Sequence, residues 1–227
     1  MGDNSQTLID AVNTARAERK ALKIVGFGSK SFMGRETEGL PLSLIEHSGV
    51  VSYQPVELVL TVRAGTSLAE IQSVLDEQGQ MLSFEPPSFG GEDSGQQASI
   101  GGTLAANISG PARPWSGSVR DMLLGTRLIN GRGEHLRFGG EVIKNVAGYD
   151  VSRLQAGAMG SFGIITEISM KVVPKPQANR TLVYELDGTA AINKMIELGR
   201  TAKPLSAVCW CDNNLYVRLS GSEQAVL

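Results

Sequence analysis

Three glycine-rich segments contain the residue types that could hold a phosphorylated ligand. The first, Gly26-x-Gly28-Ser29-x-Ser31-x-x-Gly34, follows a short apolar run. Successive backbone N–H groups around such a turn can bind a pyrophosphate group. The segment lacks both the third glycine of a Rossmann fingerprint and the Gly-Lys-Ser/Thr ending of a P-loop. A loop with a purely structural role is therefore an equal alternative.

The second segment, Ile100-Gly101-Gly102-Thr103-x-x-x-Asn107-x-x-Gly110, combines close approach with hydrogen bonding. Its paired glycines allow the backbone to lie directly against a flat or charged ligand. Thr103 and Asn107 are four residues apart, which places both side chains on one face of a helix. Arg113 follows and could offset phosphate charge, although a lone arginine in a loop is more often solvated.

The third segment runs from Asn145-Val146-Ala147-Gly148-Tyr149-Asp150 into Gly157-x-x-Gly160-Ser161-Phe162-Gly163-Ile164-Ile165-Thr166-Glu167. Of the 27 glycines in the 227-residue chain, 16 lie between Gly90 and Gly163. Because Ile, Leu and Val are interspersed among them, this region resembles neither a linker nor a disordered tract. It suggests backbone held close to a bulky ligand.

The other residues that could perform catalysis are few. His47 and His135 have no carboxylate or serine partner arranged as a triad, so we expect both to be structural. Tyr149 and Asp150 could support acid–base chemistry, but Asp150 is better placed to cap a helix that begins near Ser152.

Composition restricts the classes of function. The chain carries 21 basic and 23 acidic side chains, a net charge of -2, so nothing indicates binding to nucleic acid or anionic lipid. Cys209 and Cys211 have no nearby His, which favours reduced thiols on a strand over a metal site or a disulfide. No apolar run approaches the roughly 18 residues of a membrane span, and no signal peptide is evident. We expect a cytoplasmic protein that acts on a small molecule and binds no metal. Peripheral association with the inner membrane is an alternative.

The elements that would position the three segments are those of an α+β protein. Leu8, Val12 and Ala15 recur at helical spacing in an amphipathic stretch that reaches Lys20. Ser67 and Glu70 form a candidate capping box for a second helix. Strands are expected at 22–25, 50–53, 58–63, 123–129, 134–138 and 165–172. The change to loops and glycines from Met81 suggests that a second unit begins there.

Pro174 and Pro176 end the last of these strands, and we place a domain boundary there, which gives domains 1–178 and 179–227. Beyond it we expect a strand at 182–186, a helix marked by Ile192, Met195 and Ile196, and a hairpin of 207–211 with 215–219. Such a β-α-β-β run can be part of a ferredoxin-like unit. Because the chain stops where another helix would begin, we expect this second domain to be truncated.

In this order and spacing, the three segments resemble the vanillyl-alcohol-oxidase type of FAD-binding domain, also called the PCMH type, over residues 1–178. The resemblance implies a two-subdomain FAD-binding domain followed by the start of a ferredoxin-like cap. Some members bond the flavin covalently through a His where this chain has Ser29, so noncovalent FAD is expected. The residues implied to bind FAD are Gly26, Phe27, Gly28, Ser29 and Lys30 at the pyrophosphate, Gly101, Gly102 and Thr103 opposite, Asn107 and Arg113 nearby, and Gly163 and Ile164 at the adenosine half.

Within that family, Glu85-Pro86-Pro87, the 144–150 segment and Gly160-Ser161-Phe162-Gly163 are similar to the FAD-binding subunits of bacterial glycolate oxidases, as is 215–223. The resemblance implies oxidation of a 2-hydroxy acid such as glycolate to glyoxylate, with electrons passed to a sister FAD subunit and an iron–sulfur subunit. Two alternatives remain: a flavin subunit for assembly or electron relay only, and a sugar-nucleotide reductase that uses NADPH. The substrate-gripping His and Arg residues of such oxidases lie mainly in the C-terminal cap, so no catalytic residue is assigned.

Overall fold

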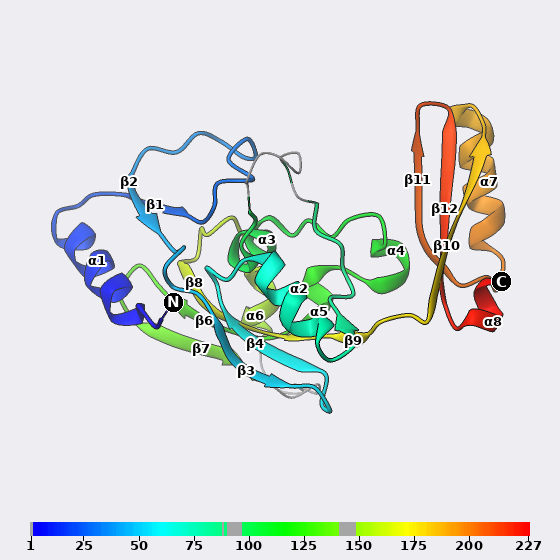
Figure 1. The fold of residues 1–227 in the computed structure, drawn as a ribbon. Helices are drawn as coiled ribbons and strands as arrows, with labels where there is room; N and C mark the ends of the chain where they lie inside the picture. The colour runs from blue at the N-terminus through cyan, green and yellow to red at the C-terminus, as the bar shows by residue number, and fades with distance from the viewer. Residues whose placement is uncertain (1, 88, 90–96, 141–148) are drawn as a thin grey trace.

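The computed structural model describes residues 2–87, 89, 97–140 and 149–227. A five-stranded antiparallel sheet lies at the centre of residues 2–174, which we call the main unit (Figure 1). In spatial order its strands are β3 (Val50–Gln54), β4 (Val59–Arg63), β8 (Ile164–Lys171), β6 (Leu123–Ile129) and β7 (His135–Gly139). Buried and partly exposed residues nearly alternate along β8, as its sequence predicts.

The early strands do not form a unit of their own. Leu60 of β4 pairs with Met170 of β8, more than one hundred residues later in the chain. The expected start of a second unit near Met81 is therefore wrong, because β4 pairs with a strand from the far end of the main unit. Single-sequence patterns identify strands but carry no information about such distant pairing.

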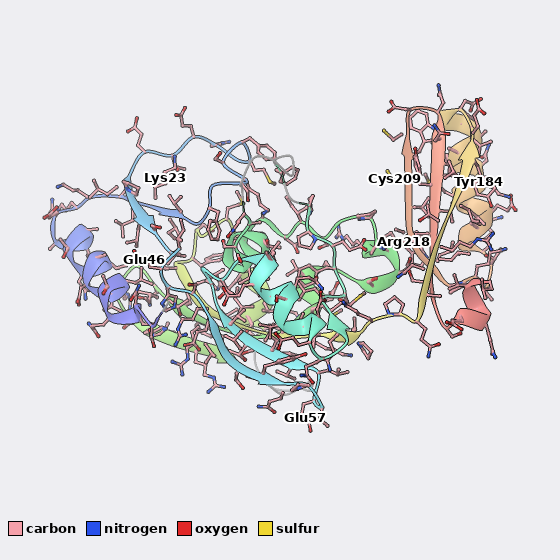
Figure 2. All side chains as sticks on the ribbon, in the orientation of Figure 1. Lys23, Glu46, Glu57, Tyr184, Cys209 and Arg218 are labelled. Atoms are coloured by element: carbon pink, nitrogen blue, oxygen red, sulfur yellow. The ribbon has the colours of Figure 1, made fainter. Side chains whose placement is uncertain are left out.

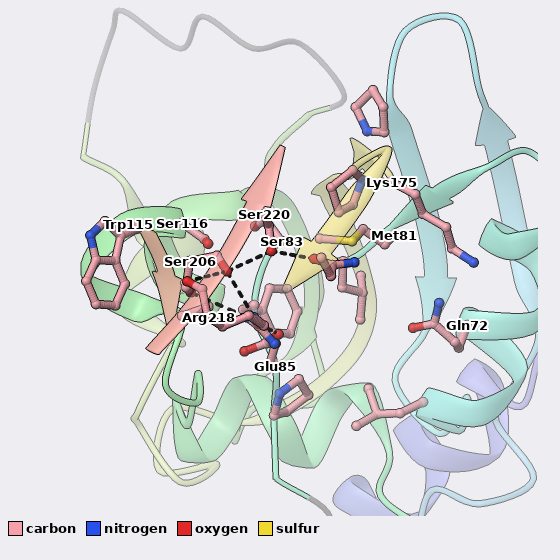
Figure 3. A pocket seen from close by; sticks show the side chains of 18 of the residues that line it. Gln72, Met81, Ser83, Glu85, Trp115, Ser116, Lys175, Ser206, Arg218 and Ser220 are labelled. Carbon is pink, nitrogen blue, oxygen red and sulfur yellow. Dashed lines mark hydrogen bonds and ion pairs between the residues drawn. The ribbon is translucent and has the colours of Figure 1, made fainter. Parts of the chain in front are cut away.

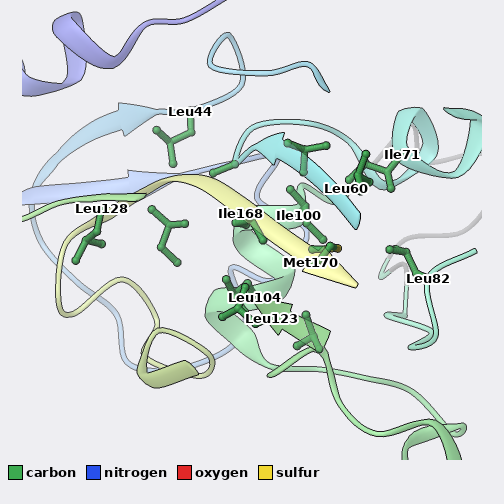
Figure 4. Packing of buried hydrophobic residues seen from close by; sticks show 14 of the residues in the cluster. Leu44, Leu60, Ile71, Leu82, Ile100, Leu104, Leu123, Leu128, Ile168 and Met170 are labelled. Atoms are coloured by element: carbon green, nitrogen blue, oxygen red, sulfur yellow. The ribbon is translucent and has the colours of Figure 1, made fainter. Parts of the chain in front are cut away.

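The helices of the main unit follow the predicted apolar spacing. Helix α1 (Ser5–Ala17) buries Leu8, Val12 and Ala15, as expected. Helix α2 (Leu68–Asp76) begins at Ser67, whose Oγ accepts the Glu70 N–H at 3.1 Å. Helix α3 (Ile100–Ala106) packs on the sheet, and Figure 4 shows Ile100 and Leu104 beside Ile168 and Met170. This packing fixes the second glycine-rich segment against the core.

Shorter elements complete the main unit. Strand β1 (Leu22–Val25) was expected, whereas its parallel partner β2 (Leu40–Ser43) was missed because its sequence, Leu-Pro-Leu-Ser, is short and contains proline. Strands β5 (Gln80–Met81) and β9 (Val173–Pro174) form a small antiparallel pair. The remaining helices are α4 (Arg113–Ser116), α5 (Val119–Met122) and α6 (Val151–Leu154).

Residues 178–227, which we call the C-terminal unit, form a separate layer at one end of the molecule (Figure 1). Their order is β10 (Ala178–Glu185), α7 (Gly188–Gly199), β11 (Leu205–Cys211), β12 (Asn214–Gly221) and α8 (Glu223–Val226). The strands form an antiparallel sheet in the order β10-β12-β11, with an apolar cluster of its own. The β-α-β-β run is thus present, and the division into two domains stays a prediction.

Helix α7 is present as expected, and two of the three apolar residues that mark it in the sequence are exposed. Ile192 and Ile196 are 59% and 51% exposed, whereas Ala191 and Leu198 are buried and Met195 packs beside them. The buried residues of α7 belong to the same apolar cluster as Leu215, Val217 and Leu219 of β12. None of the helices in the described residues is long and apolar enough to cross a membrane.

Candidate cofactor-binding site

The first glycine-rich segment lies against the start of the second. A Cβ atom at position 26 would stand 2.6 Å from Ser99 Oγ, so only glycine allows the loop after β1 to approach this closely. Ser99 caps α3, because its Oγ accepts the Gly102 N–H at 3.2 Å. The sequence interpretation missed Ser99, although a serine directly before Ile-Gly-Gly is a helix-start signal.

The second segment is held close to the sheet by its first glycine. Gly101 donates its N–H to the Ala64 carbonyl at 2.9 Å, and a Cβ at position 101 would lie 2.8 Å from Ala64 Cβ. Gly102, in contrast, is exposed at the helix N-terminus. One glycine therefore serves packing, and its neighbour leaves bare backbone accessible.

The third segment docks on the other end of α3. Gly157 N–H donates to Leu104 O at 3.1 Å, and Met159 N–H donates to Ala105 O at 3.0 Å. Asn107 ends the helix in the left-handed conformation, with φ of 52°. These bonds satisfy carbonyl groups that the last turn of α3 leaves free.

The third segment also touches the first. A Cβ at Gly160 would lie 3.2 Å from Ile24 Cδ1 of β1, and one at Gly34 would lie 3.6 Å from Met159 Cε. Each segment thus contacts the other two, although roughly 130 residues separate their ends. The structure brings the three segments together, and their binding of a cofactor stays a prediction at the level of individual residues.

Two buried polar atoms in the second segment lack hydrogen-bond partners among the described residues. They are Thr103 Oγ1, on a side chain with no exposed surface, and Asn107 Oδ1. Leaving such atoms unpaired costs about 1–3 kcal/mol each. Both belong to the predicted site, and a bound ligand could supply the missing partners, so these residues fit a polar cofactor.

The first loop supplies a positive charge. Ser29 is buried, and the half-buried Lys30 donates from Nζ to Ser29 Oγ at 3.4 Å. Burial lowers the pKa of the Lys30 amino group, which indicates that desolvation disfavours its charge. An anionic phosphate beside Lys30 would offset this desolvation and gain a charge-assisted hydrogen bond.

Neither Thr103 nor Ile164 lines the groove that Phe27 lines. The Phe27 side chain lines a groove of about 600 Å³ beside Ser67 and Glu70. Ile164 is buried in β8 opposite Ile129, and Gly163, with φ of 143°, packs against the Ile129 carbonyl. The contacts that bring the predicted residues together are mainly those between the backbones of their segments.

Arg113 lies apart from the first loop. It begins α4 and is exposed, and α4 packs toward β11 of the C-terminal unit. No contact between Arg113 and the other predicted residues is present in the described structure. Its predicted role near the cofactor accordingly has the weakest geometric support of the set.

Both histidines have structural partners, as expected. His47 is 1% exposed; its Nδ1 accepts the Asn4 N–H at 3.0 Å and its Nε2 lies 3.1 Å from Thr166 O. Burial lowers the pKa of His47, against the smaller opposing effect of Asp3. His135 Nε2 lies 2.9 Å from Thr166 Oγ1.

Asp150 caps α6 as predicted, since its carboxylate accepts the Arg153 N–H at 2.9 Å. Tyr149 is 97% exposed and has no place in a buried site. Residues 90–96 and 144–148 of the predicted motifs lie outside the described residues.

A larger groove of about 1190 Å³ separates the main unit from the C-terminal unit (Figure 3). Its polar lining includes Ser83 and Glu85 on one side, and Ser206, Arg218 and Ser220 on the other. These residues were missed as site candidates, except that Glu85 belongs to the Glu-Pro-Pro motif. Nothing local to the sequence indicates that the two groups face one another.

Comparison with known proteins identifies the family. Residues 2–139 match the model of the FAD binding domain. The chain belongs to the FAD-binding domain family. The FAD cofactor expected from the sequence is thereby confirmed for this FAD-binding domain.

Two curated relatives extend the match. The domain is 48% identical to the glycolate oxidase subunit GlcE of Escherichia coli over 224 residues, which cover 99% of this chain and 63% of that protein. It is 32% identical to the glycolate oxidase subunit GlcD of Bacillus subtilis over 158 residues, which cover 68% of this chain and 32% of that protein. The chain thus spans less than two thirds of either relative.

Solved structures support the fold. An alkyldihydroxyacetonephosphate synthase superposes with a TM-score of 0.73 at 19% identity, covering 96% of this chain and 46% of that one. At this identity the similarity concerns the fold alone. It agrees with the α+β, PCMH-type architecture expected from the sequence.

Proposed function

We propose that this FAD-binding domain is the cofactor-holding part of a glycolate oxidase subunit. The observation that carries the proposal is the 48% identity to GlcE over 99% of the chain. When bound, FAD would accept the two electrons removed as a 2-hydroxy acid becomes a 2-oxo acid, glycolate becoming glyoxylate. The partners would include a sister flavoprotein subunit, consistent with the similarity to GlcD, and an iron–sulfur subunit.

The contribution of this chain is to hold and orient the cofactor. Backbone N–H groups of 26–30 and the Lys30 ammonium would bind the pyrophosphate, and Thr103 and Asn107 would pair with polar groups of FAD. Ser29, in place of a flavin-bonding His, supports noncovalent binding. Desolvation within the packed segments would strengthen each of these polar contacts.

One observation favours a second candidate, an electron-relay subunit that does not bind glycolate. Both histidines of the chain are hydrogen-bonded to Thr166 in the core, so neither is available as a base that removes a substrate proton. A subunit of this kind would carry FAD while a partner performs the oxidation.

An absorption spectrum followed by anaerobic addition of glycolate distinguishes the candidates. A yellow protein whose flavin absorbance bleaches with glycolate supports the oxidase. A yellow protein that bleaches only after partner subunits are added supports the relay. Bleaching by NADPH instead would indicate the reductase alternative, and the absence of flavin absorbance after reconstitution would contradict all three.

A further inference from the structure

Within the described part of the chain, a single ion pair crosses the groove between the two units. Arg218 Nη2 of β12 lies 2.6 Å from Glu85 Oε1 of the main unit, and the two side chains are 30% and 34% exposed. Figure 3 shows this contact in the middle of the lining residues. Five of the other ion pairs among the described residues join two side chains of the same unit. The sixth joins Asp76 of the main unit to Lys175, in the short connection between the units.

The guanidinium of Arg218 is held in place from its own sheet. Its Nε donates to Ser206 Oγ at 2.9 Å, and its Nη2 also points at Ser206 O at 3.4 Å. Ser206 Oγ lies 2.7 Å from Ser220 Oγ, which in turn bonds Asn179 Oδ1. Figure 2 shows Arg218 on the side of this sheet that is turned toward the main unit. The network spans all three strands and fixes the direction of the charge.

The backbone of Glu85 is held in place from the main unit. Its N–H donates to Ser109 O at 2.9 Å, and Gly110, with φ of 76°, lies so close that a Cβ there would stand 3.0 Å from Glu85 Cβ. Ser109 and Gly110 directly continue the second glycine-rich segment, two residues after Asn107. The ion pair therefore connects the C-terminal sheet to the segment that carries the unpaired polar atoms.

We propose that Arg218 is a positioning residue that holds the C-terminal unit over the groove by its ion pair with Glu85. The pair uses only one carboxylate oxygen, because Glu85 Oε2 is buried without a partner among the described residues. Loss of either charge lets the C-terminal unit separate from α4 and widens the groove, while each unit keeps its own apolar cluster.

The test uses the fluorescence of Trp115, which lines the groove and is 41% exposed. The chain has two tryptophans, so Trp210→Phe isolates the Trp115 signal in the full chain. In this background we compare Glu85→Gln, Arg218→Met, Arg218→Lys and the reversed pair Glu85→Arg with Arg218→Glu. The matched control is Lys194→Met, which removes an ion pair within α7, Lys194 to Glu197 at 2.9 Å.

Glu85→Gln and Arg218→Met should increase acrylamide quenching of Trp115 and shift its emission to longer wavelength. The ratio of docked to undocked molecules should fall by about twofold to fivefold, the range that a partly exposed ion pair supports. Arg218→Lys and the reversed pair should recover part of the protection, and Lys194→Met should change nothing. Because Glu85→Gln is isosteric, this variant needs no repacking.

The dependence of Trp115 quenching on salt concentration distinguishes docking by the ion pair from docking by apolar packing. At about 1 M salt the Debye length is about 3 Å, so the parent should move toward the variants while Glu85→Gln stays unchanged. The proposal is overturned if Glu85→Gln and Arg218→Met are quenched like the parent. It is equally overturned if Lys194→Met has the same effect as they do, or if the parent does not respond to salt.

Discussion

The main unit and the C-terminal unit differ in how completely each satisfies its own polar atoms. Eight buried side-chain atoms lack hydrogen-bond partners among the described residues, and all belong to side chains between Ser5 and Ser152. The C-terminal unit, described throughout, has none. Its glycines also leave room for a side chain, whereas Gly26 and Gly101 pack against neighbours at distances that exclude a Cβ.

We interpret this difference as that between a region that holds a ligand and a unit whose buried polar groups are paired within it. A self-sufficient unit pairs its buried polar groups and alternates its strands cleanly. A cofactor-binding region keeps unpaired groups and bare backbone for a molecule that is absent from the chain itself. The following predictions test whether the contrast is real, beginning with the largest expected effect.

Gly101→Ala should destabilise the protein by about 1–3 kcal/mol, because the new Cβ meets Ala64 and forces the backbone of α3 to shift. The control is Gly199→Ala at the end of α7, where no atom lies within 4 Å of the added Cβ. That change should be neutral or stabilise by up to about 1 kcal/mol. Urea unfolding measures both, and equal losses would remove the contrast between the units.

Thr103→Val should separate folding from binding. Removing an unpaired buried hydroxyl should leave the FAD-free protein as stable as the parent, or more stable by up to about 1 kcal/mol. FAD affinity should fall by about tenfold, since one hydrogen bond to the ligand is lost. Flavin fluorescence titration gives the affinity.

The control for Thr103 is Thr61→Val. Thr61 is also buried, but its Oγ1 lies 2.8 Å from Ser169 Oγ. This substitution should lower stability and leave FAD affinity unchanged. The same loss of affinity in both variants would show that Thr103 does not meet the cofactor.

Stability should rise with pH through the main unit, because His47, whose pKa is lowered by burial, lies there. The folded pKa of His47 is lowered by burial, so the unfolded chain binds more protons near pH 6.5. Its contribution is present above pH 6.5 and is lost as the pH falls toward the folded pKa, with a slope of at most about 1.4 kcal/mol per pH unit.

Urea unfolding between pH 5 and 8 checks this dependence. Protonated His47 could no longer accept the Asn4 N–H, and Asp3, Arg63 and Glu167 are the charged groups that face it. His47→Gln should flatten the profile. A profile that stays as steep would assign the dependence to other groups.

The smallest expected loss of stability comes from removing a helix cap, and it should be equal in the two units. Ser67→Ala removes the cap of α2, and Asp187→Ala removes the cap of α7, where the carboxylate accepts the Ala190 N–H at 2.8 Å. Each should cost about 1 kcal/mol. Equal losses of stability, measured by thermal unfolding, would confirm that helix capping contributes the same in both units. The difference between the units would then be confined to the features related to the ligand.

Local signals predicted most of the elements. The buried residues of α1 and the caps at Ser67 and Asp150 all follow from spacing within a few turns of chain. The three glycine-rich segments were recognised by the same means. Strand β2 was not predicted, because a short strand that contains proline gives an ambiguous pattern.

Long-range relations could not be obtained from one sequence. The pairing of β4 with β8, the contact of Gly26 with Ser99 and the ion pair of Glu85 with Arg218 join residues far apart in the chain. Each depends on how packed layers meet, which no local pattern encodes. The role of Arg113 beside the cofactor stays a prediction, because a suitable charge near a motif does not by itself fix where the side chain lies.

Hydrogen exchange of the FAD-loaded and FAD-free protein tests the central claim most directly, namely that three distant segments form one cofactor site. The account predicts that FAD slows amide exchange in 26–30, 99–107 and 157–164 together, while α7 in the C-terminal unit is unchanged. Protection that is missing from any one of the three segments would contradict it.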